Sequence, residues 1–159
     1  MRRKDREITD ESRIDEIIER CHCCRLGFSD SGGAYIVPLS FGYEKLDGKR
    51  FFYFHSAGEG RKIDLIKSGG CVGFELDCGY TLHKVNTPDN PCGCSAAFSS
   101  IIGVGRAELL TGTEEKIHGL QCLMRHTAGM EGCEFAPEML ERVCVIRLEV
   151  REISCKVHL

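Results

Sequence analysis

The spacing of hydrophobic and polar positions changes several times along the chain, and each change predicts a different element. Ile14, Ile17 and Ile18 recur at helical spacing, so residues 10–20 are a predicted helix that Asp10 or Ser12 would cap. The same reading predicts three further helices, at 61–67, after a cap at Thr111 or Thr113, and at 137–142. The helices are short, and strands are expected to carry most of the fold.

Shorter apolar or alternating runs predict six strands, at 21–28, 34–43, 50–54, 71–76, 97–110 and 143–150. Tight turns at 29–33 and at Asp47-Gly48 would join the first three strands into an antiparallel meander. Pro38 cannot donate to a strand ladder, so its strand should lie at an edge or carry a bulge. The fold class that follows is mainly β, a small closed or partly closed barrel with helical additions.

Residues 77–95 are too polar and too rich in turn residues to be read as a strand. They hold two prolines, two glycines and three cysteines. A structureless segment of that length in a compact domain is usually functional or mobile. The prediction is a long cysteine-containing loop.

Length and charge narrow the function classes. At 159 residues the chain is predicted to be a single domain spanning 1–159. A net charge of −3 gives no overall basic field, so nucleic acid and anionic membranes are not expected partners. No apolar run approaches the roughly 18 residues of a membrane helix, and no secretory signal is visible, so a cytoplasmic protein is expected. Residues 1–9 hold four basic residues, Arg2, Arg3, Lys4 and Arg6. They suggest a solvated arm, or an arm that folds over an anionic cofactor across a dimer.

The chain has 11 cysteines, an odd number, so a disulfide framework is disfavoured and reduced thiols, mostly buried as small hydrophobic residues, are expected. A metal or iron–sulfur site is the alternative, and its soft ligands would come from Cys21, His22, Cys23, Cys24, His83, Cys92 and Cys94. The sequence does not hold two Cys-x2-Cys pairs, as a structural zinc site would, so no metal site is predicted. Cys92 and Cys94 are the thiols expected to be exposed and reactive.

The most specific chemical feature is the junction between the third strand and the next helix. The strand ends at Ser56, a glycine-rich turn follows, and Arg61 and Lys62 open the helix. A hydroxyl, backbone N–H donors and two cations together form a candidate phosphate site. The alternative is that the glycines only make a turn and that Arg61 and Lys62 are solvated.

Three segments in order, Tyr35–Leu39, Phe52–Lys62 and Ser99–Ala107, together resemble the flavin-binding split barrels related to pyridoxamine 5′-phosphate oxidase. The Nim-type nitroimidazole-resistance branch is the most similar, and the likeness extends to the opening Met1–Glu7. The resemblance runs over nearly the whole chain. It implies a six-stranded antiparallel split barrel with Greek-key connections.

The resemblance also implies a cofactor, FMN, and a homodimer with the cofactor at the subunit interface. It places the flavin ring along the second strand, beside Ile36, Val37, Pro38 and Leu39. It implies that the phosphate and ribityl chain of FMN are bound by His55, Ser56, Arg61 and Lys62. It also makes His55 a candidate catalytic residue. Ser100, with Ser99 beside it, falls where the oxidases carry an amide side chain.

Two functions remain open. The oxidases of the family carry a tryptophan and an Arg/His substrate clamp in a longer C-terminal region, and this sequence has no tryptophan, so oxidation of vitamin B6 is not expected. The first hypothesis is an FMN-dependent oxidoreductase that reduces a small planar, nitro-aromatic acceptor. The second is a binding module that holds a flavin or a haem without turnover, with His55 or His83 as the haem ligand.

Overall fold

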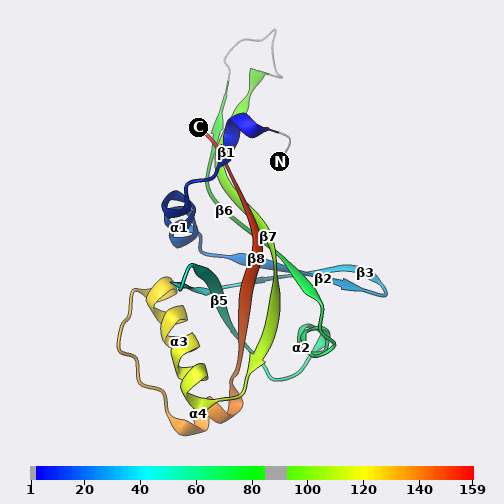
Figure 1. Cartoon of the computed structure of the whole chain (residues 1–159), viewed down its shortest axis with the longest axis vertical. Coiled ribbons are helices and arrows are strands. Elements are labelled where there is room, and N and C mark those ends of the chain that lie inside the picture. The colour runs from blue at the N-terminus through cyan, green and yellow to red at the C-terminus, as the bar shows by residue number, and fades with distance from the viewer. Residues whose placement is uncertain (1–2, 85–92) are drawn as a thin grey trace.

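The computed structural model describes residues 3–84 and 93–159, and it is built around one antiparallel sheet (Figure 1). The helical elements are a 3-10 turn η1 (Lys4–Arg6) and the helices α1 (Glu11–Arg20), α2 (Arg61–Lys67), α3 (Thr113–Ala128) and α4 (Pro137–Arg142). The strands are β1 (Glu7–Ile8), β2 (Cys24–Asp30), β3 (Gly33–Leu39), β4 (Gly42–Leu46), β5 (Lys49–Ser56), β6 (Cys71–His83), β7 (Ser95–Leu110) and β8 (Cys144–His158).

The sheet runs in the order β3-β2-β6-β7-β8-β5-β4, with β1 paired to the far end of β8. Every pair in it is antiparallel, and β3 and β4 at its two ends are not hydrogen-bonded to each other, so the sheet does not close. The predicted class, mainly β with helical additions, is confirmed. The structure has eight strands instead of the six predicted, because the segment 34–43 breaks into β3 and β4 and because β1 was not foreseen.

The meander predicted for the first three strands is wrong. β2 pairs with β3 and β4 pairs with β5, but these two hairpins lie at opposite ends of the sheet order. Turn residues fix only the local hairpins. The place of β5 beside β8 comes from burial, since Phe52 and Phe54 are fully buried and pair with the buried Leu148 and Ile146.

The long loop predicted for 77–95 is also wrong in its first part. β6 continues through His83 and pairs with β7 as far as Ser95, so the hairpin extends well beyond the body of the sheet (Figure 1). The register shifts between Cys78 and Thr81, and Gly79 there has φ of 70°, a conformation that favours glycine. This bulge hides the strand pattern in the sequence. Cys92 lies outside the described residues.

The N-terminal segment is not a free arm over the residues that the structure describes. Glu7 and Ile8 pair with Lys156 and Cys155 of β8, and Arg3 makes an ion pair with Asp5. Ile8 packs against the main core, which explains why this short strand holds its place. Arg2, the first basic residue of the predicted arm at 1–9, lies outside the described residues.

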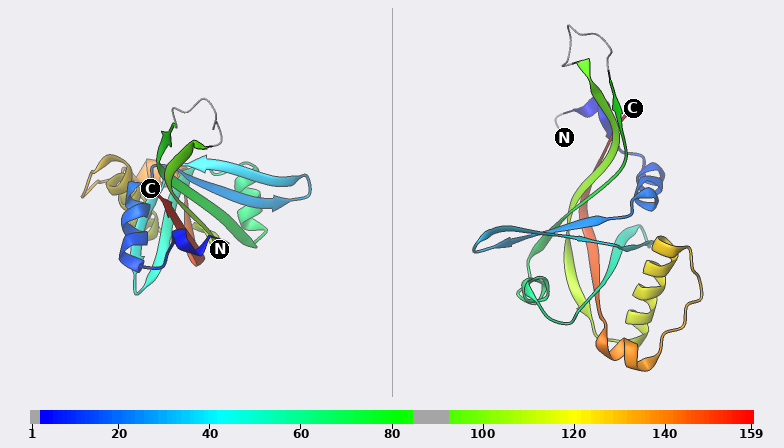
Figure 2. Two further views of the ribbon diagram at one scale, coloured as in Figure 1. Left: turned by 90° about the horizontal axis from the view of Figure 1, so that it is seen from above. Right: turned by 180° about the vertical axis from the view of Figure 1, so that it is seen from behind.

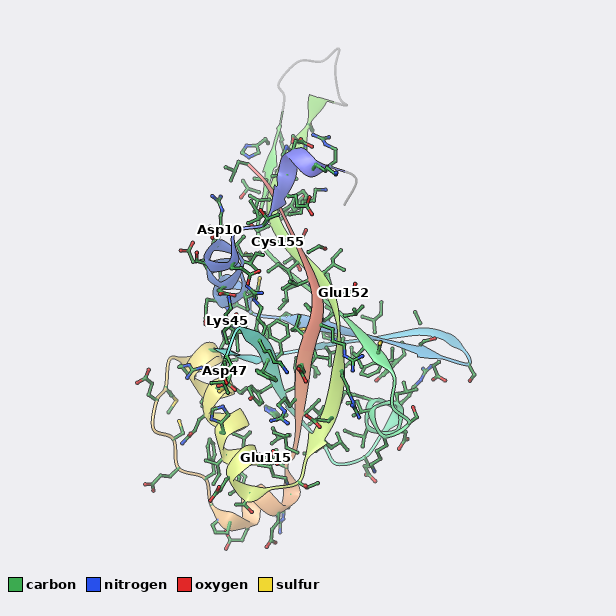
Figure 3. All side chains as sticks on the ribbon, viewed as in Figure 1. Asp10, Lys45, Asp47, Glu115, Glu152 and Cys155 are labelled. Atoms are coloured by element: carbon green, nitrogen blue, oxygen red, sulfur yellow. The ribbon has the colours of Figure 1, made fainter. Side chains whose placement is uncertain are left out.

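Helix α1 begins as predicted. The Asp10 carboxylate accepts a 2.8 Å hydrogen bond from the Arg13 backbone N–H, and Ile14, Ile17 and Ile18 are buried. Helix α3 differs from the prediction, since its cap is Gly112 and neither Thr111 nor Thr113 caps it. Figure 3 shows Lys45 beside α1, and Lys45 makes ion pairs with Glu11 and Asp15 of that helix. Glu115, in the first turn of α3, lies at the end of α3 that is far from Lys45.

Two hydrophobic clusters hold the elements together. The larger one, the main core, lies inside the sheet and joins α1 and α2 to the strands. The smaller one, the α3 cluster, joins α3 and α4 to the opposite side of β5 and β8. Its buried residues are Tyr53, Leu110, Leu120, Cys122, Leu140 and Val145. The views in Figures 1 and 2 agree that α2 lies on the side of the β2–β3 hairpin and that α3 and α4 lie on the other side of β8. Among the described helices, none combines the length and apolar composition needed to cross a membrane.

Candidate functional site

The β3 strand provides an exposed edge, as Pro38 predicts. β3 pairs with β2 on one side only, within the part of the chain that the structure describes. Tyr35, Val37 and Leu39 pack against the main core, while Ile36 is 63% exposed and Pro38 is exposed on the opposite face. The free edge leaves alternate backbone N–H and C=O groups for a ligand, and Pro38 removes one donor from that row.

Arg61 connects the start of α2 to the β2–β3 hairpin. Its guanidinium Cζ lies 4.5 Å from the centroid of the Tyr35 ring, and its Nε donates a 2.7 Å hydrogen bond to Oδ2 of Asp30. The bond from Arg61 is the main reason that the pKa of Asp30 is lowered from its ordinary value. Arg61 is therefore already oriented at the end of β3, with its side chain half exposed.

Asp30 and Tyr35 were not predicted as site residues. In the sequence, Asp30 lies within the predicted hairpin turn at 29–33, and Tyr35 lies in the strand that follows the turn. That position does not reveal that α2 folds against the same hairpin, because the contact joins residues about 30 positions apart. Since α2 has only seven residues, charge on Arg61 and Lys62 has to supply most of the attraction for an anion.

Lys62 and Ser56 lie near Cys144 at the start of β8. Ser56 is directly opposite Cys144 in the β5–β8 pairing, and its hydroxyl donates to the carbonyl of Ala57 at 2.6 Å. Burial raises the pKa of the Cys144 thiol, and the positive charges of Lys116 and Lys62 partly oppose that rise. Lys62, in the first turn of α2, follows the end of β5 by six positions in the chain.

His55 faces away from this group. Successive residues of a strand point to opposite faces, and Phe54 is in the main core while Tyr53 is in the α3 cluster. His55 shares the face of Tyr53 and is exposed, whereas Ser56 shares the face of Phe54. Within one chain, then, His55 and Ser56 point to opposite sides of β5.

Ser99 and Ser100 lie far from the other predicted site residues within one chain. Ser100 pairs with Asp77 and Lys156, while His55 pairs with Val145, the partner of Leu110. The stretch of β7 from Ser100 to Leu110 spans roughly 30 Å at about 3.3 Å per residue. Ser99 is buried and lines a different pocket, formed by α1 and the end of β8 and including Arg13, Arg20, Phe98 and His158.

The outer face of the sheet carries an apolar strip between these two regions. Ile36, Gly27, Gly73 and Val104 are successive cross-strand partners on β3, β2, β6 and β7, so they share one face. The next exposed position on β7 is Ile102, which is 59% exposed. The two glycines have no side chains, and this leaves the strip flat. A Cβ at either glycine would meet only the carbonyl oxygen of the other, at 3.7–3.8 Å.

The cysteines divide by burial. Cys21, Cys24, Cys122 and Cys155 are buried, which confirms the hydrophobic interpretation for these four. Cys94 is exposed as predicted, and Cys71 is exposed as well, which the sequence did not indicate. All ten cysteines in the described segments are free.

A model of the family described as pyridoxamine 5′-phosphate oxidase matches residues 10–157. The chain belongs to the pyridoxamine 5′-phosphate oxidase family. The matched range contains both the β3 edge and Arg61. No curated protein matches the chain.

Solved structures agree with this family and with the fold. A candidate 5-nitroimidazole antibiotic resistance protein from Bacteroides thetaiotaomicron is 30% identical, with a TM-score of 0.79 over 95% of this chain and 86% of that one. The flavocytochrome Anf3 from Azotobacter vinelandii is 20% identical, with a TM-score of 0.79 over 100% of this chain and 72% of that one. An FAD and heme binding protein from Mycobacterium smegmatis is 14% identical, with a TM-score of 0.76 over 96% and 73%. The first match confirms the resemblance to the Nim-type branch, and the other two show the fold.

The residues present suit a flat, phosphate-bearing cofactor. The free edge of β3 offers hydrogen-bonding groups in a row, Ile36 and Pro38 offer apolar contact on one face of the strand, and Arg61 stands over Tyr35, whose side chain is on the other face. An anion that reaches Arg61 has to compete with Asp30 or share the guanidinium with it. This competition opposes phosphate binding.

Proposed function

We propose that this member of the pyridoxamine 5′-phosphate oxidase family binds FMN, with the ring along β3 and the phosphate on Arg61 and Lys62. The observation that carries the proposal is the position of Arg61, which is fixed over Tyr35 beside the free edge of β3. The names of two structural relatives, a flavocytochrome and an FAD-binding protein, support a flavin as the ligand class.

The flavin would supply reversible electron transfer, and the chain would supply binding and orientation. Backbone groups on the edge of β3 would hydrogen-bond the polar rim of the ring. Pro38 would leave one position of that edge without a donor. Arg61 and Lys62 would neutralise the phosphate, as charge-assisted hydrogen bonds do most effectively.

A second copy of the chain would complete the site. Ser99 and Ser100 lie roughly 30 Å of strand away from the row of His55, so one chain cannot bring these groups to one small cofactor. The flat strip formed by Ile36, Gly27, Gly73 and Val104 is an apolar face that a second copy could cover. We therefore propose a homodimer with the flavin at its interface, in which one chain supplies His55 and the other supplies Ser100 to each flavin.

The proposed reaction is reduction of a small planar acceptor such as a nitro-aromatic compound. The 30% identity with a candidate nitroimidazole-resistance protein supports this class. The chain has no tryptophan, which disfavours vitamin B6 as the substrate despite the family's name. His55, exposed and at the end of β5, would donate a proton or a hydrogen bond near the flavin.

Turnover tests this proposal. FMN-loaded protein is reduced anaerobically with dithionite, excess reductant is removed, and a nitro-aromatic compound is added while the flavin absorbance is followed. We expect reoxidation of the flavin with loss of the nitro-aromatic absorbance, and slower reoxidation in His55→Ala at matched FMN occupancy. The matched control is His83→Ala. Flavin that stays reduced in the wild type would instead support a binding module, and a Soret band in the purified protein would support haem.

A further inference from the structure

Three side chains with metal-binding atoms meet on the side of the sheet that α3 covers. Glu44 comes from β4, and His118 and Cys122 stand one turn apart on α3. Nε2 of His118 lies 2.8 Å from Oε2 of Glu44 and 3.6 Å from Sγ of Cys122. Sγ of Cys122 lies 3.9 Å from the same Glu44 oxygen, which closes the triangle.

Two glycines bring the helix close enough for this triangle to form. A Cβ at Gly42 would lie 2.4 Å from the Leu123 backbone nitrogen, and a Cβ at Gly119 would lie 2.8 Å from the Tyr53 ring. Only glycine allows both approaches, so α3 rests directly on β4 and β5. Glu44, two residues after Gly42, is thereby held against the turn of α3 that carries His118 and Cys122.

The arrangement is not that of a nucleophile relay. In such a relay the base uses one ring nitrogen for the nucleophile and the other for its orienting carboxylate. Here Nε2 of His118 approaches both Glu44 and Cys122. The donor atoms of all three side chains lie within 4.8 Å of one another, as the ligands of one ion do.

The distances between the donor atoms suit a tetrahedral cation. Zinc binds nitrogen and oxygen at about 2.0–2.2 Å and sulfur at about 2.3 Å, which places its ligand atoms roughly 3.3–3.6 Å apart. The 3.6 Å from His118 to Cys122 already matches, and the other two separations differ from that range by about half an ångström or less. A small opening between His118 and Glu44 would therefore admit the ion.

We propose that Glu44, His118 and Cys122 form a site for a divalent cation of the zinc class. Imidazole nitrogen, carboxylate oxygen and thiolate sulfur are the donors that zinc accepts. Carboxylate and thiolate together balance the two positive charges, and the thiol proton leaves to solvent as the sulfur–metal bond forms. The fourth position faces solvent, because the His118 side chain is 51% exposed while Glu44 is 17% exposed and Cys122 is buried.

Neighbouring groups position these ligands. The Tyr53 hydroxyl donates to Oε1 of Glu44 and so orients the carboxylate. Arg125 is a cation close to the triangle, with Nη2 3.8 Å from Sγ of Cys122, and this atom also donates to the carbonyl of Tyr43 at 2.9 Å. The bond to Tyr43 keeps the guanidinium to one side of the proposed ion.

This site is separate from the proposed flavin site. It lies within the α3 cluster, whereas Tyr35 and Arg61 lie at the hairpin on the other side of the sheet (Figures 1 and 2). Among the described residues, no side-chain hydrogen bond or ion pair joins the three ligands to β3 or α2. Failure of either proposal leaves the other standing.

Titration with Co²⁺ and Zn²⁺ tests the site on the purified full chain. Cobalt bound to a thiolate gives a charge-transfer absorption, so we expect that band in the wild type and its loss in His118→Ala and Cys122→Ala. Zinc affinity should fall about tenfold or more in both variants, and about tenfold in Tyr53→Phe, since second-shell partners are worth about 10- to 100-fold. Cys133→Ala removes a thiol outside the triangle and is the matched control, expected to behave as the wild type.

A thermal readout keeps the test independent of any single variant. Zinc should raise the Tm of the wild type and of Cys133→Ala, and it should not raise that of His118→Ala. His118 is exposed, so its variant is expected to fold even if Cys122→Ala does not. Equal zinc affinity and an equal Tm shift in the wild type and folded His118→Ala would overturn the proposal, and so would a wild type that gives no thiolate–cobalt band.

Discussion

Arg61 at the start of α2 donates a 2.7 Å hydrogen bond to Asp30 at the end of β2. This bond fixes the position of the Arg61 guanidinium in the proposed phosphate site when no ligand is bound. The guanidinium is oriented by an acid and an aromatic ring before any ligand arrives. The Asp30 carboxylate that orients Arg61 also competes with a phosphate for it. The attraction of Arg61 for phosphate and the competition from Asp30 can each be measured.

Replacing the two cations should weaken binding of FMN and leave riboflavin, which lacks the phosphate, almost unaffected. Charge-assisted hydrogen bonds contribute about 1.5–3 kcal/mol each and are not additive, so Arg61→Ala/Lys62→Ala should lose about 10- to 1,000-fold in FMN affinity. Fluorescence titration with both flavins measures this difference. Lys67→Ala, at the other end of α2, is the matched control. An equal loss for riboflavin would show that the phosphate binds elsewhere.

Removing the competing charge should act in the opposite direction. In Asp30→Asn the amide no longer holds Arg61 by an ion pair, so the guanidinium is freer to meet the phosphate. Exposed ion pairs are worth about 0–1 kcal/mol, so FMN should bind up to about fivefold more tightly. Titration at low ionic strength gives the largest effect. Weaker binding of FMN by this variant would mean that Asp30 positions Arg61 more than it competes.

Asp15 should give the protein an acid-dependent part of its stability. Burial raises the pKa of Asp15, but hydrogen bonds from Lys45, Tyr43 and Arg50 outweigh burial and lower it overall. A carboxyl with a lowered folded-state pKa stabilises the fold above its unfolded value of about 3.9 and loses that contribution as pH falls through the folded value.

The test compares Asp15→Asn with the wild type by urea unfolding. At pH 7 the variant should lose about 1.5–3 kcal/mol of unfolding free energy, and this difference should shrink as pH is lowered below about 4. Asp47→Asn serves as the control, since asparagine also tolerates the positive φ of 50° at that turn. A difference between Asp15→Asn and the wild type that is the same at every pH would contradict the assignment.

Gly42 should be intolerant of even one added carbon. A Cβ there would lie 2.4 Å from the Leu123 nitrogen, and backbone cannot move aside as a flexible side chain can. Forcing extra volume into a packed interior costs about 1–3 kcal/mol, so Gly42→Ala should lower Tm by several degrees. Gly58→Ala, where a Cβ meets nothing within 4 Å, is the control. Equal Tm values for the two variants would mean that α3 is not seated on β4 as described.

The sequence predicts the local features of this fold well. The Ile14, Ile17 and Ile18 spacing gives α1 with its Asp10 cap, and Pro38 gives the exposed edge of β3. It does not predict which hairpins become neighbours, because that depends on burial of residues such as Phe52 and Phe54 against strands about 90 positions away. The bulge after Cys78 likewise conceals the extension of β6.

The candidate sites follow the same division. Arg61 and Lys62 can be picked out because turn, glycines and cations are adjacent in the sequence. Asp30 and Tyr35 cannot, because they reach Arg61 only through the packing of α2 on the hairpin. The triangle of Glu44, His118 and Cys122 joins β4 to a helix 74 positions later, and no short-range spacing reveals it.

Retention of FMN by the purified chain tests the central proposal most directly. The protein is incubated with FMN and desalted, and its absorbance spectrum is recorded beside that of Arg61→Ala/Lys62→Ala treated in the same way. We expect a flavin band that elutes with the wild-type protein near one flavin per chain and is strongly reduced in the double variant. A wild type from which all flavin separates as free FMN would contradict it.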